Sequence, residues 1–331
     1  MSITIKDVAK EAGVSVATVS RVLNGSCNVS DESTKKVNET IARLNYSPNF
    51  LGRNLRKCET NVILVIMPTS EHSLYSKIVM GMQEYAGKVG YDIITAVSYS
   101  TSTAETRQMN MLFNRTVDGV ILLGTQYDAA SLNKLAENYN VALCCEGVEG
   151  ANVLTVAVDD EQAAFDAVAA LIKKGHKRIG FIGTNSAAIS STARENGYIR
   201  ALKEYGIEIK NEYIYKESYD YDCGGRAFEY FNALAEKPTA IFAVSDLLAI
   251  SAMHKAIDMD IDVGKDVAIM GFDNISMCEW IIPTLSTVEQ PCSKMGELVV
   301  AKLIENMNKT TKDNHYYTVD HRIILSESTV D

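Results

Sequence analysis

Residues 4–24 read TIKDVAKEAGVSVATVSRVLN, and this stretch decides how the first part of the chain folds. Thr4 is predicted to cap a first helix, because its hydroxyl can accept a hydrogen bond from a backbone N–H near Asp7. Gly13 is predicted to end that helix, since glycine adopts a left-handed conformation without steric cost. Ser15 is then placed to cap a second helix after a tight turn. The pattern is typical of a helix-turn-helix.

The side chains of this stretch separate into an inward and an outward set. The inward set has helical spacing and is apolar: Val8, Ala9, Ala12, Val14, Val19, Val22 and Leu23. The outward set has small, hydroxyl, amide and guanidinium groups that fit the major groove of DNA: Val16, Ala17, Thr18, Ser20, Arg21 and Asn24. A plain helical hairpin would share the spacing, so the pattern alone leaves that alternative open.

The composition indicates a cytosolic chain with more than one domain. A length of 331 residues with 47% hydrophobic content is enough for two or three cores. No apolar run reaches the roughly 18 residues of a membrane span, and the start MSITIKDVAK lacks the apolar segment of a signal peptide. The seven cysteines form no CxxC pair, so a reducing compartment is expected. Adjacent Cys144 and Cys145 are interpreted as strand residues rather than a redox pair.

Charge is divided unevenly along the chain. Residues 1–60 carry nine Lys and Arg against six Asp and Glu, whereas the whole chain carries 32 against 42 and a net charge of −10. A basic module on an acidic body concentrates attraction to phosphate in its own residues. Since basic surfaces also serve solubility, the imbalance supports a DNA role without establishing it.

A third helix and a connecting segment follow the first two helices. Ser30 is predicted to cap the third helix, with acidic residues at the positive end of the helix dipole. Its inward stripe would close a three-helix core and consists of Val37, Ile41 and Leu44. Pro48 breaks the helical run, and a short helix-capable segment at 49–56 comes next.

These motifs, in this order, resemble the LacI/GalR family of bacterial transcription regulators. The resemblance implies a DNA-binding headpiece at 1–47, a hinge helix and linker at 48–61, and a leucine, Leu55, that wedges into the minor groove. An exposed leucine among basic and amide side chains fits such a wedge; an ordinary linker that packs Leu55 on the body is the alternative. The residues expected to contact DNA are Thr4, Ser15, Val16, Ala17, Thr18, Ser20, Arg21, Asn24, Tyr46, Asn49, Leu55 and Arg56.

From Asn61 onward, short apolar runs alternate with amphipathic helical segments. The runs predicted to form strands are VILVIMP, DIITAV, GVILLG, VALCC, KRIGFIG, TAIFAV and DVAIMGF. Because these runs are apolar on both faces, they favour parallel sheets that helices cover on both sides. The units are too many for one ordinary open sheet, so two similar lobes are expected.

The resemblance gives these lobes their boundaries. The fold class it implies is an all-α helix-turn-helix headpiece followed by a two-lobe α/β body of the type I periplasmic-binding-protein kind. The body would occupy 62–331, with an N-lobe at about 62–158 and 291–318 and a C-lobe at about 161–288 and 321–331.

Ligands of doubly wound sheets bind beyond the carboxyl ends of the strands, which for two lobes is the cleft between them. The segment RENGYIRAL matches a family signature that implies ligand contact by Arg194. An arginine with carboxylates and aromatic walls fits a polyhydroxylated sugar. The expected ligand-binding residues are Leu74, Tyr75, Glu146, Arg194, Tyr221, Ser245, Asp246, Asp273 and Gln290.

Two of these assignments have alternatives that the sequence leaves open, and the loop residue His72 is a further candidate. Asp246 could cap the following helix and shape the cleft only indirectly. Tyr219 could supply the aromatic face in place of Tyr221. His72 lies in the right loop, but a lone loop histidine is more often solvated than functional.

No nucleophile elbow, Walker loop, HExxH or strand-linked GxGxxG occurs in the sequence, so no enzyme, cofactor or metal site is expected. Sequence and resemblance together predict a cytoplasmic repressor that acts as a homodimer on operator DNA and responds to a small ligand such as a sugar. No leucine heptads follow the body, so a tetramer is not expected. The alternatives are a regulator of the same family that a purine or a carrier protein co-regulates, and a solute-binding module without DNA function.

Overall fold

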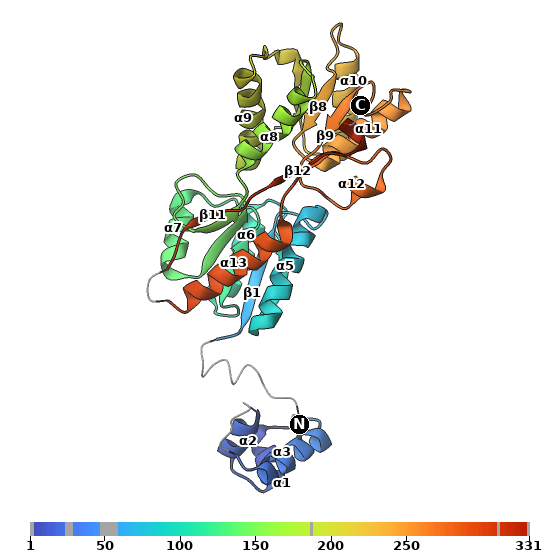
Figure 1. Cartoon of the computed structure of the whole chain (residues 1–331). Helices are drawn as coiled ribbons and strands as arrows, with labels where there is room; N and C mark the ends of the chain where they lie inside the picture. Colours follow the sequence, from blue (N-terminus) through green and yellow to red (C-terminus); the bar gives the residue numbers. More distant parts are fainter. Residues whose placement is uncertain (1–2, 24–28, 47–58, 186–187, 310–311, 330–331) are drawn as a thin grey trace. The chain divides into compact units, whose positions relative to one another are not determined.

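The computed structural model describes residues 3–23, 29–46, 59–185, 188–309 and 312–329, in two compact units, Met1–Glu59 and Thr60–Asp331 (Figure 1). The DNA-contact predictions for Asn24, Asn49, Leu55 and Arg56 fall outside these described residues.

The described part of the first unit is a cluster of three helices, α1 (Ile5–Ala12), α2 (Val16–Leu23) and α3 (Asp31–Leu44). At the start of α1, the Asp7 carboxylate accepts hydrogen bonds from the amide and hydroxyl of Thr4 over 2.8 and 2.7 Å. Gly13 ends α1 with a φ of +67°, and the Ser15 hydroxyl accepts from the Thr18 amide over 3.0 Å. The predicted start, turn and second cap are therefore confirmed.

The inner faces of the three helices form one small core. Val8, Val19 and Val37 are fully buried, and Ala9 is nearly so. Around them pack the half-buried side chains of Ile5, Ala12, Val14, Val22, Leu23, Ile41, Leu44 and Tyr46. All the side chains that the helical spacing predicted to point inward lie in this core, together with Ile5 and Tyr46.

The second unit begins with the N-lobe, built on a parallel sheet whose described strands follow the order β11-β5-β4-β3-β1-β2. The strands are β1 (Val62–Met67), β2 (Asp92–Val97), β3 (Gly119–Leu122), β4 (Val141–Cys145), β5 (Leu154–Ala157) and β11 (Tyr316–Thr318). Successive side chains of a strand point to opposite faces, so Ile63 and Val65 join one core while Leu64 and Ile66 join the other.

Two pairs of helices cover these two faces. One face carries α5 (Ser73–Val89) and α13 (Cys292–Met307), and the other carries α6 (Ser102–Phe113) and α7 (Ala129–Asn138). The pair α5 and α13 approach closely through glycines: a Cβ on Gly81 would lie 2.3 Å from the Ser293 carbonyl oxygen, and one on Gly296 would lie 2.2 Å from that of Ile78.

The C-lobe contains a second parallel sheet, with its described strands in the order β7-β6-β8-β9. They are β6 (Ile179–Thr184), β7 (Ile214–Glu217), β8 (Ala240–Ala243) and β9 (Ala268–Met270). On one side lie α8 (Asp160–Lys173) and α9 (Ile189–Glu204), and on the other α10 (Tyr221–Asn232) and α11 (Asp246–Asp258), followed by the short α12 (Met277–Trp280) (Figure 1).

The described chain passes between the lobes in three places. It leaves β5 for α8, it runs from β10 (Thr287–Glu289) into α13, and it returns from β11 to β12 (Arg322–Ile324), which pairs antiparallel with β10 (Figure 1). The predicted fold class, a helix-turn-helix unit and a two-lobe α/β body, is confirmed. None of the described helices combines the length and the apolar character that crossing a membrane requires.

Candidate ligand-binding cleft and DNA-binding helix

A cavity of about 720 Å³ lies between the N-lobe and the C-lobe. Its walls come from segments that follow the carboxyl ends of strands in both sheets, for example Thr69 after β1, Glu146 after β4 and Ser245 after β8. Parallel sheets of this kind place ligands at that edge. The cavity is therefore where a ligand-binding site is expected.

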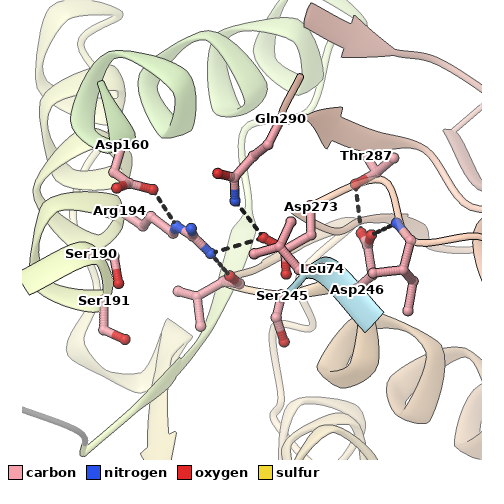
Figure 2. A network of polar contacts seen from close by, with 12 residues as sticks. Leu74, Asp160, Ser190, Ser191, Arg194, Ser245, Asp246, Asp273, Thr287 and Gln290 are labelled. Atoms are coloured by element: carbon pink, nitrogen blue, oxygen red, sulfur yellow. Dashed lines mark hydrogen bonds and ion pairs between the residues drawn. The ribbon is translucent and has the colours of Figure 1, made fainter. Parts of the chain in front are cut away.

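Arg194, on α9, is held by several partners at the C-lobe wall of the cavity. Its Nε donates to Asp160 Oδ1 over 2.8 Å and its Nη1 to the Val244 carbonyl over 2.6 Å. The same Nη1 lies 3.5 Å from Asp273 Oδ1 (Figure 2). The guanidinium carbon lies 3.6 Å from the centre of the Phe272 ring. The guanidinium is thus fixed in plane and in direction before any ligand arrives.

The signature around Arg194 explains how α9 carries this side chain. Gly197 lets α9 lie against α8, because a Cβ there would come within 2.3 Å of the Glu161 carbonyl oxygen. One residue later, the buried Tyr198 donates its hydroxyl to the Ile179 carbonyl of β6 over 2.8 Å. The glycine and tyrosine position the helix, and the arginine in its second turn faces the cavity.

Asp273, after β9, is the carboxylate at the centre of the site and is only 2% exposed. Its Oδ1 accepts from Gln290 Nε2 over 2.7 Å, and its Oδ2 lies 3.6 Å from His72 Nε2. Its φ is +120°, a conformation that is costly for a side chain other than glycine. The Asp273 amide donates to the Val288 carbonyl over 2.9 Å, which helps hold the backbone in this conformation.

The N-lobe contributes the opposite wall through the start of α5. His72 caps α5 by accepting from the Leu74 amide, and its Nε2 lies 2.9 Å from the Tyr219 hydroxyl of the C-lobe. Burial raises the pKa of both the Tyr75 and the Tyr219 phenols above their usual range, so both hydroxyls stay protonated. Two aromatic rings and a histidine therefore meet across the cavity.

Burial also raises the pKa values of two carboxylic acids around the site. Burial raises the pKa of Asp160 to about 6, although the neighbouring Arg194 guanidinium opposes the shift. Burial and the charge of Asp273 raise the pKa of Asp246 to about 7. Burial acts to lower the pKa of Arg194, but the charges of Asp160 and Asp273 outweigh it and raise that pKa. Arg194 is therefore permanently charged.

Seven of the predicted ligand residues line the cavity: Leu74, Tyr75, Glu146, Arg194, Ser245, Asp273 and Gln290. Asp246 does not, and its placement at the cavity is corrected. It is 0% exposed, and it accepts from the Thr287 hydroxyl over 2.5 Å and from the Ile275 amide over 2.8 Å. Asp246 therefore anchors the loop that carries Asp273, while Ser245 caps α11.

Tyr221 is the second correction. It is 43% exposed, and its hydroxyl bonds to His254 away from the cavity, whereas Tyr219 lines the wall. Asp220 is the reason, because it caps α10 and leaves Tyr219 before the helix and Tyr221 in its first turn. Asp160 was missed altogether, although it follows the short strand β5 and the rule of strand ends would have found it.

On α2, the predicted DNA-contacting side chains lie on the face away from the core. Val16 is 41% exposed, and Ala17 and Arg21 are also exposed. Thr18 and Ser20 are half-buried at the edge of this face. Of the remaining predictions, Thr4 and Ser15 are exposed at the helix starts, and Tyr46 packs against the headpiece core.

In the part of the chain that the structure describes, no cluster of His, Cys, Asp and Glu has the arrangement of a metal site.

Comparison with known proteins agrees with both units. Residues 4–49 match the bacterial regulatory proteins of the lacI family, and residues 168–329 match a periplasmic binding protein-like domain. The chain is 38% identical to catabolite control protein A of Priestia megaterium, over 99% of this chain and 100% of that protein. It is 31% identical to the transcriptional repressor CytR of Escherichia coli, over 98% and 96%.

Solved structures show the same fold. The lac repressor dimer bound to operator and the anti-inducer ONPF matches with a TM-score of 0.90 at 22% identity, over 100% of both chains. The regulator CelR in complex with cellobiose matches with a TM-score of 0.74 at 26% identity, over 98% of this chain and 99% of that one. The chain therefore belongs to the LacI family of bacterial transcription regulators, which bind DNA under the control of a ligand.

Proposed function

We propose that this protein is a repressor that binds operator DNA through α2 and releases it when a sugar enters the cleft between its lobes. One observation carries the ligand part of this proposal. The Arg194 guanidinium, the Asp273 carboxylate and the Gln290 amide are gathered at one point of the cavity wall, with Asp273 Oδ1 2.7 Å from Gln290 Nε2 and 3.5 Å from Arg194 Nη1 (Figure 2).

This set of groups suits hydroxyl-rich ligands. Guanidinium and amide N–H groups donate to hydroxyl and ring oxygens, and carboxylates accept from hydroxyls. The rings of Tyr75 and Tyr219 line the same cavity and can cover the C–H faces of a sugar ring. A polyol would therefore find both its polar and its apolar surfaces matched.

The lobes contact each other around the cavity, and a ligand bound there can change these interlobe contacts. Lys77 of the N-lobe donates to the Asn274 carbonyl of the C-lobe over 2.7 Å, and the Ser190 hydroxyl of the C-lobe donates to Glu146 over 3.0 Å. A ligand shifts such an arrangement only as far as it binds two arrangements differently. A hundredfold effect on DNA affinity requires about 2.7 kcal/mol of differential affinity.

A homodimer is proposed from the surface of the C-lobe. Trp280 is 75% exposed and Ile282 is 86% exposed, two large apolar side chains on one short segment. Exposed apolar groups of this size mark an interaction surface, and a second copy of the chain would cover them. Two copies also give two α2 helices, which matches an operator with two half-sites. Since its DNA partner lies there, the dimer is proposed to act in the cytoplasm.

Selection from a randomised duplex pool, followed by gel shifts, tests the DNA part of the proposal. The full chain should enrich a two-fold-related sequence, and binding should weaken as salt rises. Thermal-shift screening against sugars, sugar phosphates and purines tests the ligand part, because a ligand of the folded protein raises its melting temperature. A chain that binds ligands but no duplex would be a solute-binding module, and a purine that tightens DNA binding would make it a co-repressed regulator.

A further inference from the structure

The cavity has a surplus of acidic side chains. Four carboxylates line it, those of Glu105, Asp128, Glu146 and Asp273, against one guanidinium, that of Arg194, and the imidazole of His72. The positive charge of Arg194 is already shared between two carboxylates, at 2.8 Å from Asp160 and 3.5 Å from Asp273. The lining side chains therefore carry a surplus of formal negative charge, which favours a cationic over an anionic ligand.

Three of the four lining carboxylates are already engaged by the protein. Glu105 accepts from the Thr125 hydroxyl over 2.5 Å and from the Gln126 amide over 2.8 Å, one bond to each oxygen. Asp128, an exposed residue, caps α7 by accepting from the Ser131 amide on Oδ1. Asp273 accepts from Gln290 and faces Arg194.

Glu146 differs from Glu105 and Asp273 because one of its oxygens has no protein partner among the described residues, and from the exposed Asp128 because it is half-buried. Its hydrogen bonds from the described residues, from the Ser190 amide over 3.3 Å and the Ser190 hydroxyl over 3.0 Å, both end on Oε2. Among the described residues, no Lys, Arg or His lies within ion-pair distance of Glu146. A carboxylate that lines a cavity with one oxygen available and no cationic partner can serve as the counter-ion of a positively charged ligand group.

We infer that the ligand is an amino sugar, a polyol that carries a protonated amine, and that Glu146 pairs with this amine. The inference rests on the proposed function and narrows its ligand class. Hydroxyl groups of the same ligand would bind Arg194, Asp273 and Gln290, as proposed above. Phosphorylated sugars are selected against, because a phosphate carries about −1.5 to −2 charges and meets the same acidic surplus that attracts an amine.

The test compares matched sugars on the full chain by isothermal titration at about pH 6.5, where a primary amine is protonated. The pairs are glucose with glucosamine, galactose with galactosamine, and cellobiose with its diamino counterpart; glucose 6-phosphate represents the anions. In at least one pair, the amine should bind at least tenfold more tightly than the neutral sugar, and the phosphate should bind more weakly than either.

Two variants distinguish a direct ion pair between Glu146 and the amine from a change in the overall charge of the protein. Glu146→Gln can still accept from Ser190, but it should reduce the preference for the amine to less than threefold. Glu149→Gln, at an exposed position outside the cavity, should keep the preference of the parent chain. An equal loss in both variants would overturn the role of Glu146.

The outcomes also separate this inference from the function on which it rests. Neutral sugars that bind as tightly as their amines, or a phosphate that binds most tightly, would overturn the amino-sugar inference and leave a sugar-responsive regulator. If no member of the panel binds, both the inference and the sugar proposal are wrong.

Discussion

The Arg194 guanidinium stacks on the ring of Phe272, the residue that directly precedes Asp273 in the chain. One segment of the C-lobe therefore carries both the ring that orients the arginine and the carboxylate that faces it. Any ligand that displaces Asp273 also changes the surroundings of Arg194. The two groups are expected to respond to a ligand as a unit.

Arg194→Ala should produce a regulator that binds its operator but no longer responds to its ligand. Ligand affinity should fall at least a hundredfold, because the fork of N–H donors is lost. The variant should also unfold more easily, by about 3–5 kcal/mol, because Asp160 loses its buried partner. Arg107→Ala, at an exposed position on α6, is the matched control. Gel shifts with and without ligand measure the response, and a normal response would place the effector site elsewhere.

Arg21→Ala should relax the choice of base at one position in each half-site. An arginine on the exposed face of α2 can bind the O6 and N7 of guanine through two N–H groups, a contact worth about 1–3 kcal/mol. Competition gel shifts with operators changed at single base pairs would locate the position. Equal weakening on every sequence would instead identify Arg21 as a phosphate contact.

Gly81→Ala should destabilise the body by about 1–3 kcal/mol, because its Cβ would lie 2.3 Å from a carbonyl oxygen of α13 and force two helices apart. Gly87→Ala is the control on the same helix. Nothing lies within 4 Å of a Cβ at Gly87, so this change should stabilise the body by about 0.5–1 kcal/mol. Urea unfolding measures both, and effects of the same sign would contradict the close packing of α5 on α13.

Asp246→Asn should remove part of the pH dependence of stability. Burial raises the pKa of Asp246 from 3.8 to about 7 in the folded state, so its contribution to stability is full below about pH 4 and is lost as the pH rises through 7. Between pH 6 and 8 the free energy of unfolding of the parent chain should fall by about 1 kcal/mol because of this group, and that of the variant should not. Asp258→Asn, a control at an exposed position on the same helix, should show the same pH dependence of unfolding as the parent chain. If Asp246→Asn also shows that pH dependence, Asp246 is not the titrating group.

Local chemistry made most of the architecture predictable. Gly13 and Ser30 mark a helix end and a helix start through bonds within a few residues, and the structure confirms both. The long apolar runs became strands because they bury both faces. Strands such as β7, at Ile214–Glu217, escaped prediction because they are short and only partly buried at the edge of a sheet.

The site was harder to predict where two neighbouring residues carry the same chemistry. Tyr219 and Tyr221 are separated by one residue, and only the cap at Asp220 decides which one reaches the cavity. Asp246 follows a strand, as a ligand residue should, but its carboxylate turns inward because Thr287 and Ile275 supply its partners from distant segments. Such partners are visible only after the chain has folded.

The position of α13 has a consequence for synthesis on the ribosome. The core on one face of the N-lobe sheet lies within residues 64–153, but the other face needs Met295, Val299 and Leu303 of α13. The ribosome must make residues 161–288, most of the C-lobe, before it makes this helix, a delay on the order of ten seconds. During that time the nascent N-lobe exposes the part of this apolar sheet face that α5 does not cover, a surface to which chaperones can bind until α13 emerges.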